Sequence, residues 1–201
     1  MTKHRVGQGK PHGSPHDFLF PAYTKTNTRR DSLKYSLKTI ELISFITASL
    51  LGVVFHFIYG WSGENGVAGL FFPVNESTWE HLKLIFFPIL LVSIGEYFIF
   101  HTRYDNFICV KLLSALLAMV LTVVCFYTYI GVYGKNSDVM NILIYFLSMA
   151  AAYRYSCRAL TGRKGTRFPS TVCYWGFVAL CFVFFIFSLF PPHIGLFASP
   201  V

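Results

Sequence analysis

Charged residues are scarce in this sequence of 201 residues. They make up 13% of the chain, whereas a soluble domain carries roughly 25%. Hydrophobic residues account for 54%, and phenylalanine alone occurs 22 times. A soluble fold of this size has too little interior to bury that much apolar surface. The composition therefore excludes an ordinary soluble domain and predicts an integral membrane protein that crosses the bilayer several times.

The sequence also lacks a regular pattern of cysteines. The five cysteines are scattered along the chain, their number is odd, and no two of them form a CxxC pair. This pattern excludes a small secreted scaffold built on disulfides. We expect most of the cysteines to be small apolar residues that pack in or beside the membrane spans. They are Cys109, Cys125, Cys157, Cys173 and Cys181.

The first 36 residues differ from the rest of the chain. Seven of them are lysine or arginine, separated mostly by glycine, proline, serine and threonine, and the longest apolar run covers only residues 18–20. A segment of this composition cannot bury enough apolar surface to fold alone. We therefore predict a basic, disordered tail over residues 1–36 and a membrane domain over residues 37–201.

Five apolar runs in the membrane domain predict an all-α bundle of five transmembrane helices. A helix needs about 20 residues to cross the hydrocarbon layer. The fourth run is the shortest, but Ser137 and Asp138 favour a helix start before it and Arg154 favours an end after it. Between the first two runs, the apolar segment 67–72 is expected to lie along the membrane interface. The predicted spans are residues 39–59, 84–100, 112–132, 139–153 and 171–190.

The positive charges are distributed very unevenly across these five spans. Of the 17 lysines and arginines, 15 lie in the tail and the second and fourth loops, and only Lys83 and Lys135 lie on the other side. The positive-inside rule then places the N-terminus in the cytoplasm and the C-terminus outside. A model without the fourth span would put five positive charges outside. The net charge of +8 thus indicates membrane topology and contact with anionic lipids of the cytoplasmic leaflet, and no nucleic acid.

Two carboxylates are predicted inside the membrane near the cytoplasmic face. Glu41 lies in the first span and Glu96 in the second, at similar depth because the two helices run in opposite directions. An ionisable side chain in lipid needs a partner or a function. Neighbours along the chain offer ordinary partners, namely Lys34 and Lys38 for Glu41, and His101 and Arg103 for Glu96. If these pairs do not form, Glu41 and Glu96 indicate an ion pathway in a small transporter or channel subunit.

A second polar group is predicted at the extracytoplasmic boundary. His56 lies near the outer end of the first span, the segment 72–81 precedes the second span, and His193 follows the last span. Imidazole and carboxylate groups at one depth suit Zn²⁺ or another divalent metal with an open position for water. This favours a metal-dependent hydrolase that acts on a lipid-like substrate at the outer leaflet. The predicted ligands are His56, His81 and His193, with Glu76 or Glu80 as general base and Asn75 or Ser77 as a polarising donor.

The same segment also has a purely structural interpretation. Ser77 and Glu80 are spaced as a capping box, in which the serine caps the amide of the glutamate and the glutamate bonds back to the amide of the serine. Capping gives no role to Glu76, His81 or His193. A third hypothesis is a non-catalytic membrane scaffold whose segment 75–81 binds a partner.

Two motifs carry a resemblance to a known family. The sequence FPVNESTWEHLK at residues 72–83, together with PPHIGLF at residues 191–197, resembles the signature of small integral membrane proteins of Gram-positive bacteria. These form a family of unknown function, and the similarity covers residues 37–198. The resemblance implies a multi-pass protein of the bacterial plasma membrane and implies no particular activity.

Overall fold

The computed structural model describes the backbone of residues 22–100, 104, 106–162 and 168–199, and the side chains from Leu37 onward. The chain divides into two units, Met1–Ser36 and Leu37–Val201, at the boundary expected between tail and membrane domain. Helix α1 (Ala22–Trp61) begins inside the expected tail, so the prediction of disorder was wrong for residues 22–36. The physical reason is that neither glycine nor proline occurs between Pro21 and Gly52 to interrupt the helix. Residues 1–21 of the expected tail lie outside the described part.

The described residues of the membrane domain form helices and no strands, which confirms the all-α prediction. The elements after α1 are α2 (Gly66–Phe71), α3 (Thr78–Phe100), α4 (Phe107–Tyr133), α5 (Asp138–Thr161), α6 (Ser170–Leu189) and the short 3-10 helix η2 (Gly195–Phe197). Within the described residues, α1, α3, α4 and α6 are long and apolar enough to cross a membrane. The chain therefore has the helices of a membrane protein.

Helix α5 is the fourth of the five predicted spans, and it is less apolar than the others. Its 24 residues give a length of about 36 Å, enough for a crossing. Its composition nevertheless leaves it outside the four helices that qualify by length and apolarity. The helix begins at Asp138, as predicted, but it continues past Arg154 to Thr161. The side chain of Arg154 is exposed on the surface of the helix, and the helix therefore continues past it without burying its charge.

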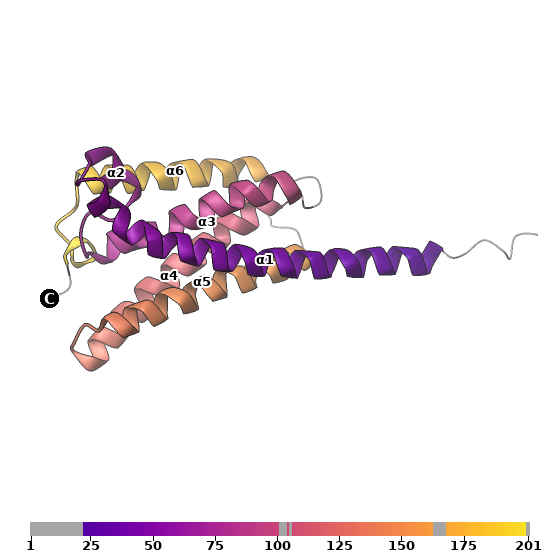
Figure 1. The fold of residues 1–201 in the computed structure, drawn as a ribbon, viewed down its shortest axis with the longest axis horizontal. Coiled ribbons are helices and arrows are strands. Elements are labelled where there is room, and N and C mark those ends of the chain that lie inside the picture. Colours follow the sequence, from indigo (N-terminus) through magenta and orange to yellow (C-terminus); the bar gives the residue numbers. More distant parts are fainter. Residues whose placement is uncertain (1–21, 101–103, 105, 163–167, 200–201) are drawn as a thin grey trace, which may run out of the picture. The chain divides into compact units, whose positions relative to one another are not determined.

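Hydrogen bonds between α1 and α5 establish that these two helices are antiparallel. The hydroxyl of Tyr145 donates to the carbonyl of Ser49 at 3.0 Å. Further along α5, the hydroxyl of Ser156 donates to Oε1 of Glu41 at 2.7 Å, and Glu41 precedes Ser49 in α1. Residue numbers therefore rise along α5 as they fall along α1 (Figure 1).

The remaining helices continue this alternation. Helix α3 begins beside the end of α1, where the rings of His56 and His81 are 5.3 Å apart. Helices α4 and α6 begin at the same end of the bundle, where Cys109 and Cys173 are joined. Helices α1, α4 and α6 thus run one way and α3 and α5 the other (Figure 1). We call the end of the bundle that carries α2 the α2 end, and the other the opposite end.

The link between Cys109 and Cys173 is a disulfide with a Cα–Cα distance of 5.0 Å. The expectation that the cysteines act as separate apolar packing residues was wrong for this pair. The two residues are 64 positions apart in sequence and meet only because the first turns of α4 and α6 lie side by side. Cys125 and Cys181 have free thiols.

Helix α3 is the most deeply buried of the four long apolar helices. In its most apolar stretch 56% of the residues are buried, compared with 17% in α6. Aromatic rings fill the contact between these two helices, and the rings of Phe86 and Phe184 lie 5.1 Å apart. On its other side, α3 lies close to α1 at Gly52. A Cβ atom at this position would lie 2.5 Å from the carbonyl oxygen of Leu84 and would overlap the hydroxyl of Tyr145.

This close approach predicts that a methyl group at Gly52 will loosen the bundle. We expect Gly52→Ala to lower the midpoint of thermal unfolding in detergent, because overpacking costs roughly 1–3 kcal/mol. Gly95→Ala in α3 is the matched control, since nothing lies within 4 Å of the added Cβ. Equal midpoints for the two variants would contradict the close approach of α1 to α3 and α5.

Candidate functional site

The connection between α1 and α3 builds the α2 end. After Trp61 the chain turns through Gly63 and Glu64, which both have positive φ angles, of 69° and 59°. Asn65 then caps α2, because its side-chain oxygen accepts the amide of Val67 at 2.9 Å. Helix α2 coincides with the apolar segment expected at the interface. From its end the chain returns through residues 72–77 to the first turn of α3.

A buried ion pair in α3 fixes this returning segment. Nζ of Lys83 lies 2.6 Å from Oε2 of Glu80, and the two side chains are 0% and 3% exposed. The ammonium group of Lys83 also donates to the carbonyl of Gly69 at 2.7 Å and to that of Phe72 at 3.4 Å. Lys83 was predicted to be a loop charge, and this was wrong, because its side chain closes the C-terminal end of α2 from inside α3.

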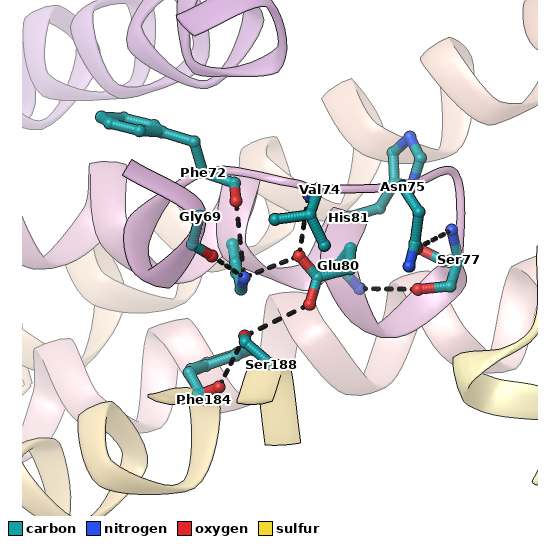
Figure 2. A network of polar contacts seen from close by, with 10 residues as sticks. Gly69, Phe72, Val74, Asn75, Ser77, Glu80, His81, Phe184 and Ser188 are labelled. Carbon is teal, nitrogen blue, oxygen red and sulfur yellow. Dashed lines mark hydrogen bonds and ion pairs between the residues drawn. The ribbon is translucent and has the colours of Figure 1, made fainter. Parts of the chain in front are cut away.

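The carboxylate of Glu80 accepts two further hydrogen bonds. The amide of Val74 donates to Oε2 at 3.0 Å, and the hydroxyl of Ser188 in α6 donates to Oε1 at 3.3 Å (Figure 2). Glu80 and Lys83 therefore join α2, the returning segment, α3 and α6 in one buried polar network. A carboxylate that is engaged with an ammonium group in this way is poorly suited to act as a general base.

The capping box is half confirmed. The amide of Glu80 donates to the hydroxyl of Ser77 at 3.3 Å, as a capping serine requires. The reciprocal bond, from the amide of Ser77 to the carboxylate of Glu80, is replaced. The carboxylate of Glu80 contacts Lys83 and the amide of Val74 instead. The amide of Ser77 donates to the side-chain oxygen of Asn75 at 2.9 Å (Figure 2). Ser77, Asn75 and Glu80, all predicted as catalytic groups, thus have defined structural contacts.

Two of the predicted metal ligands meet beside Glu76. Its Oε2 lies 3.3 Å from Nε2 of His81 and 3.9 Å from Nε2 of His56. One potential ligand atom from each of these three residues lies within 4.8 Å of the other two. Glu76 comes from the returning segment, His56 from α1 and His81 from α3. The end of α1 and the start of α3, which belong to the first two predicted spans, therefore bring two of the three predicted histidine ligands together.

The orientation of His81 is fixed by the backbone. Its Nδ1 lies 2.9 Å from the carbonyl oxygen of Ser77. A carbonyl can only accept, so Nδ1 carries the proton in this contact, and Nε2 is the nitrogen directed toward Glu76. A backbone carbonyl that orients an imidazole in this way is typical of the surroundings of a metal-ligating histidine.

His56 and Glu76 of this group line an open cleft of about 160 Å³. Glu76 is the most exposed of the three side chains, at 68%, and both histidines are partly exposed. Water and a substrate can therefore reach them. The cleft is lined by His56, Tyr59, Gly60, Pro73, Val74, Asn75 and Glu76.

The third predicted histidine ligand, His193, does not belong to this group within the described residues. It is exposed in the segment between α6 and η2. The η2 helix that follows packs through Phe197 against the ring of Trp79, at 4.9 Å between ring centroids. Trp79 and His81 are two positions apart in α3 and therefore point to nearly opposite sides of the helix. The chain after α6 packs on the side of α3 that carries Trp79, away from His81. The prediction of a set of three histidines was therefore wrong.

The two predicted carboxylates of the opposite end do meet, but around an unexpected partner. Nζ of Lys111 lies 2.8 Å from Oε1 of Glu41 and 2.7 Å from Oε2 of Glu96. Of the partners expected from the sequence, Lys38 is exposed. The side chains of Lys34, His101 and Arg103 lie outside the described part of the chain.

Sequence reasoning missed Lys111 because it was assigned to the second loop. Apolar residues flank it on both sides, at positions 107–110 and 112–113, and this was the available signal that it lies within a buried helix.

The buried pair at the α2 end predicts strong coupling between Glu80 and Lys83. We expect Lys83→Met or Glu80→Gln alone to lower the free energy of unfolding by about 3–5 kcal/mol, because each leaves a buried group without its partner. The double variant should lose less than the sum of the two. A double-mutant cycle from unfolding in mixed micelles measures this coupling, with the exposed Glu64→Gln as control. Additive effects would show that the pair does not act as a unit.

The comparison with known proteins gives a family and no activity. A family of unknown function (DUF6512) matches residues 25–201, which is most of the chain. The chain matches no curated protein and no solved structure. The match includes α1 from its second turn and all the helices that carry the two polar groups. The chain therefore belongs to the family of unknown function DUF6512.

Proposed function

We propose that this chain is a metal-dependent hydrolase of the bacterial plasma membrane. In this proposal it crosses the bilayer five times and binds one divalent ion, with Zn²⁺ preferred, through His56, Glu76 and His81 at the extracytoplasmic face. The substrate is a lipid or another amphiphile. The observation that carries the proposal is the convergence of two imidazoles and one carboxylate, of which His56 and Glu76 line an open cleft.

The proposed topology rests on helix direction and charge. Successive long helices alternate in direction, and α5 takes part in this alternation as a crossing helix would. Lys83 and Lys111 are buried and can be left out of the count of lysines and arginines on the two sides of the membrane. The count then changes from 15 against 2 to 14 against 1. The asymmetry supports a cytoplasmic N-terminus and an extracytoplasmic α2 end. The resemblance to membrane proteins of Gram-positive bacteria supports a bacterial plasma membrane.

The donor set suits a catalytic metal ion. Two histidines and one carboxylate are a usual protein ligand set for catalytic zinc, which keeps a fourth position open. Ligand atoms at about 2.0–2.1 Å in tetrahedral geometry lie roughly 3.3 Å from each other. The contact between His81 and Glu76 already has this length, at 3.3 Å. His56 and Glu76, at 3.9 Å, need only small rotations of partly exposed side chains.

The cleft supplies the other elements of a hydrolytic site. A divalent ion held here lowers the pKa of a coordinated water toward about 7 and polarises a substrate carbonyl. The side-chain oxygen of Asn75 is engaged by the amide of Ser77, so its NH₂ group is left to donate to a substrate oxygen. Glu76 then serves as a ligand, and its role as general base is given up. The open side of the cleft lets protons pass to solvent.

Zinc binding by the purified full chain tests this function. With a tag that contains no histidine, we expect about one zinc ion per chain and an affinity at least about tenfold weaker in His56→Ala, His81→Ala and Glu76→Gln. His193→Ala is the matched control and should bind as the wild type does, because this residue lies outside the group. Hydrolysis of a fluorogenic lipid ester should follow zinc content and stop with a chelator.

Two results would contradict the proposal. One is the absence of zinc binding by the wild-type chain. The other is a loss of affinity in His193→Ala equal to that in His56→Ala. Zinc binding without hydrolysis of any ester or amide lipid would leave the metal site in place and remove the hydrolase.

A further inference from the structure

The opposite end of the bundle contains three buried ionisable groups, contributed by three helices. Glu41 of α1, Glu96 of α3 and Lys111 of α4 have side chains that are 3%, 4% and 1% exposed. The hydroxyl of Ser156 in α5 donates to the same oxygen of Glu41 that Lys111 contacts. The rings of Phe107 and Tyr153 lie 5.5 and 5.1 Å from Nζ of Lys111.

The charges in this cluster do not balance. Two carboxylates face one ammonium group, so the fully ionised cluster carries a net charge of −1. Among the described residues, the other titratable group that faces it is the phenol of Tyr153, which is neutral at ordinary pH. Arg154 and Arg158 of α5 are exposed and point away. An unbalanced charge buried in a medium of low dielectric constant costs several kcal/mol, so a further positive charge is needed.

The cluster also has oxygen atoms that can accept that charge. Oε2 of Glu41, Oε1 of Glu96 and the hydroxyl of Tyr153 are buried and have no hydrogen-bond partner within the described residues. By contrast, the Glu80–Lys83 pair at the α2 end has one cation for one anion, and both carboxylate oxygens are hydrogen-bonded. The deficit is therefore specific to the cluster of Glu41, Glu96 and Lys111.

A proton fits this deficit better than a metal ion does. Sodium or a divalent ion needs several oxygen ligands around it, and membrane proteins obtain many of these from carbonyls of interrupted helices. Here Glu41, Glu96, Lys111 and Ser156 all lie within regular turns of α1, α3, α4 and α5, so the carbonyls of these residues are occupied by helical hydrogen bonds. A proton needs only one free carboxylate oxygen, and two neighbouring carboxylates commonly share one.

We infer that Glu41, Glu96 and Lys111 form a proton-binding site in the core of the bundle, in which the two carboxylates hold one proton between them. The bound proton makes the cluster neutral. It lies on Oε2 of Glu41 or Oε1 of Glu96, and Lys111 holds the other oxygens. Intramembrane carboxylates of this kind serve in proton relays. The inference does not depend on the proposed metal site, which lies at the other end of the bundle and shares no residue with it.

Infrared spectroscopy of the purified full chain, in a detergent without ester groups, tests the inference at neutral pH. The wild type should show the carbonyl stretch of one protonated carboxylic acid. This band should be lost in Glu41→Gln and in Glu96→Gln, because each leaves one carboxylate and one ammonium group. It should grow about twofold in Lys111→Met, where two carboxylates without a cation must each bind a proton. Glu64→Gln removes an exposed carboxylate and should leave the band unchanged.

Isotope labelling makes the test independent of whether the variants fold. In the wild type the band should shift when glutamate is labelled with ¹³C and stay in place when aspartate is labelled. Absence of the band from the wild type would overturn the inference. So would a band that does not shift with labelled glutamate, or one that keeps its intensity in both glutamine variants.

Discussion

The ion pair of Lys83 with Glu80 determines the geometry of the α2 end. Its ammonium group binds two carbonyls at the end of α2, and its carboxylate binds the amide of Val74 in the returning segment. These bonds join two irregular stretches of chain to α3 inside an apolar bundle, where backbone groups without partners are costly. The position of Glu76, two residues after Val74, follows from them. Glu76 meets His81 and His56 because the buried pair of Glu80 and Lys83 holds the adjoining chain.

The two ends of the bundle contain the same residue types in different proportions. At the α2 end one lysine meets one glutamate, and each of their polar atoms has a partner, as a structural pair requires. At the opposite end one lysine meets two glutamates, and two carboxylate oxygens have neither a hydrogen bond nor an ion-pair contact in the described structure. Charge balance thus separates a pair that maintains the fold from a cluster that is suited to bind a proton.

Much of the architecture could be predicted from the sequence, because length and apolarity determine which helices can cross a membrane. The meeting of His56 and His81 also followed from depth alone, since α1 and α3 are antiparallel neighbours. The position of His193 could not be predicted in this way. Its depth in the membrane does not determine on which side of α3 the chain after α6 packs. The disulfide between Cys109 and Cys173 was missed for a related reason, since it depends on which helices are neighbours.

The partners of the buried charges were the least predictable feature. Lys83 and Lys111 both lie close to predicted span ends, where a lysine usually extends toward the interface. Each turns inward instead because a glutamate on its own helix or a neighbouring one lies within reach. Their sequence neighbours are apolar, and only the three-dimensional positions of Glu80, Glu41 and Glu96 decide the direction. Family membership adds no function to these residues, so the geometry is the evidence for both proposals.

The most direct test is the zinc affinity of Lys83→Met compared with that of Lys135→Met. Lys83 contacts none of the three proposed ligands, whereas Lys135 is an exposed lysine outside the network. The account predicts that folded Lys83→Met binds zinc at least about tenfold more weakly than the wild type, because Glu76 loses its position. Lys135→Met should bind zinc as the wild type does. Equal affinity in all three proteins would contradict the claim that the buried pair builds the site.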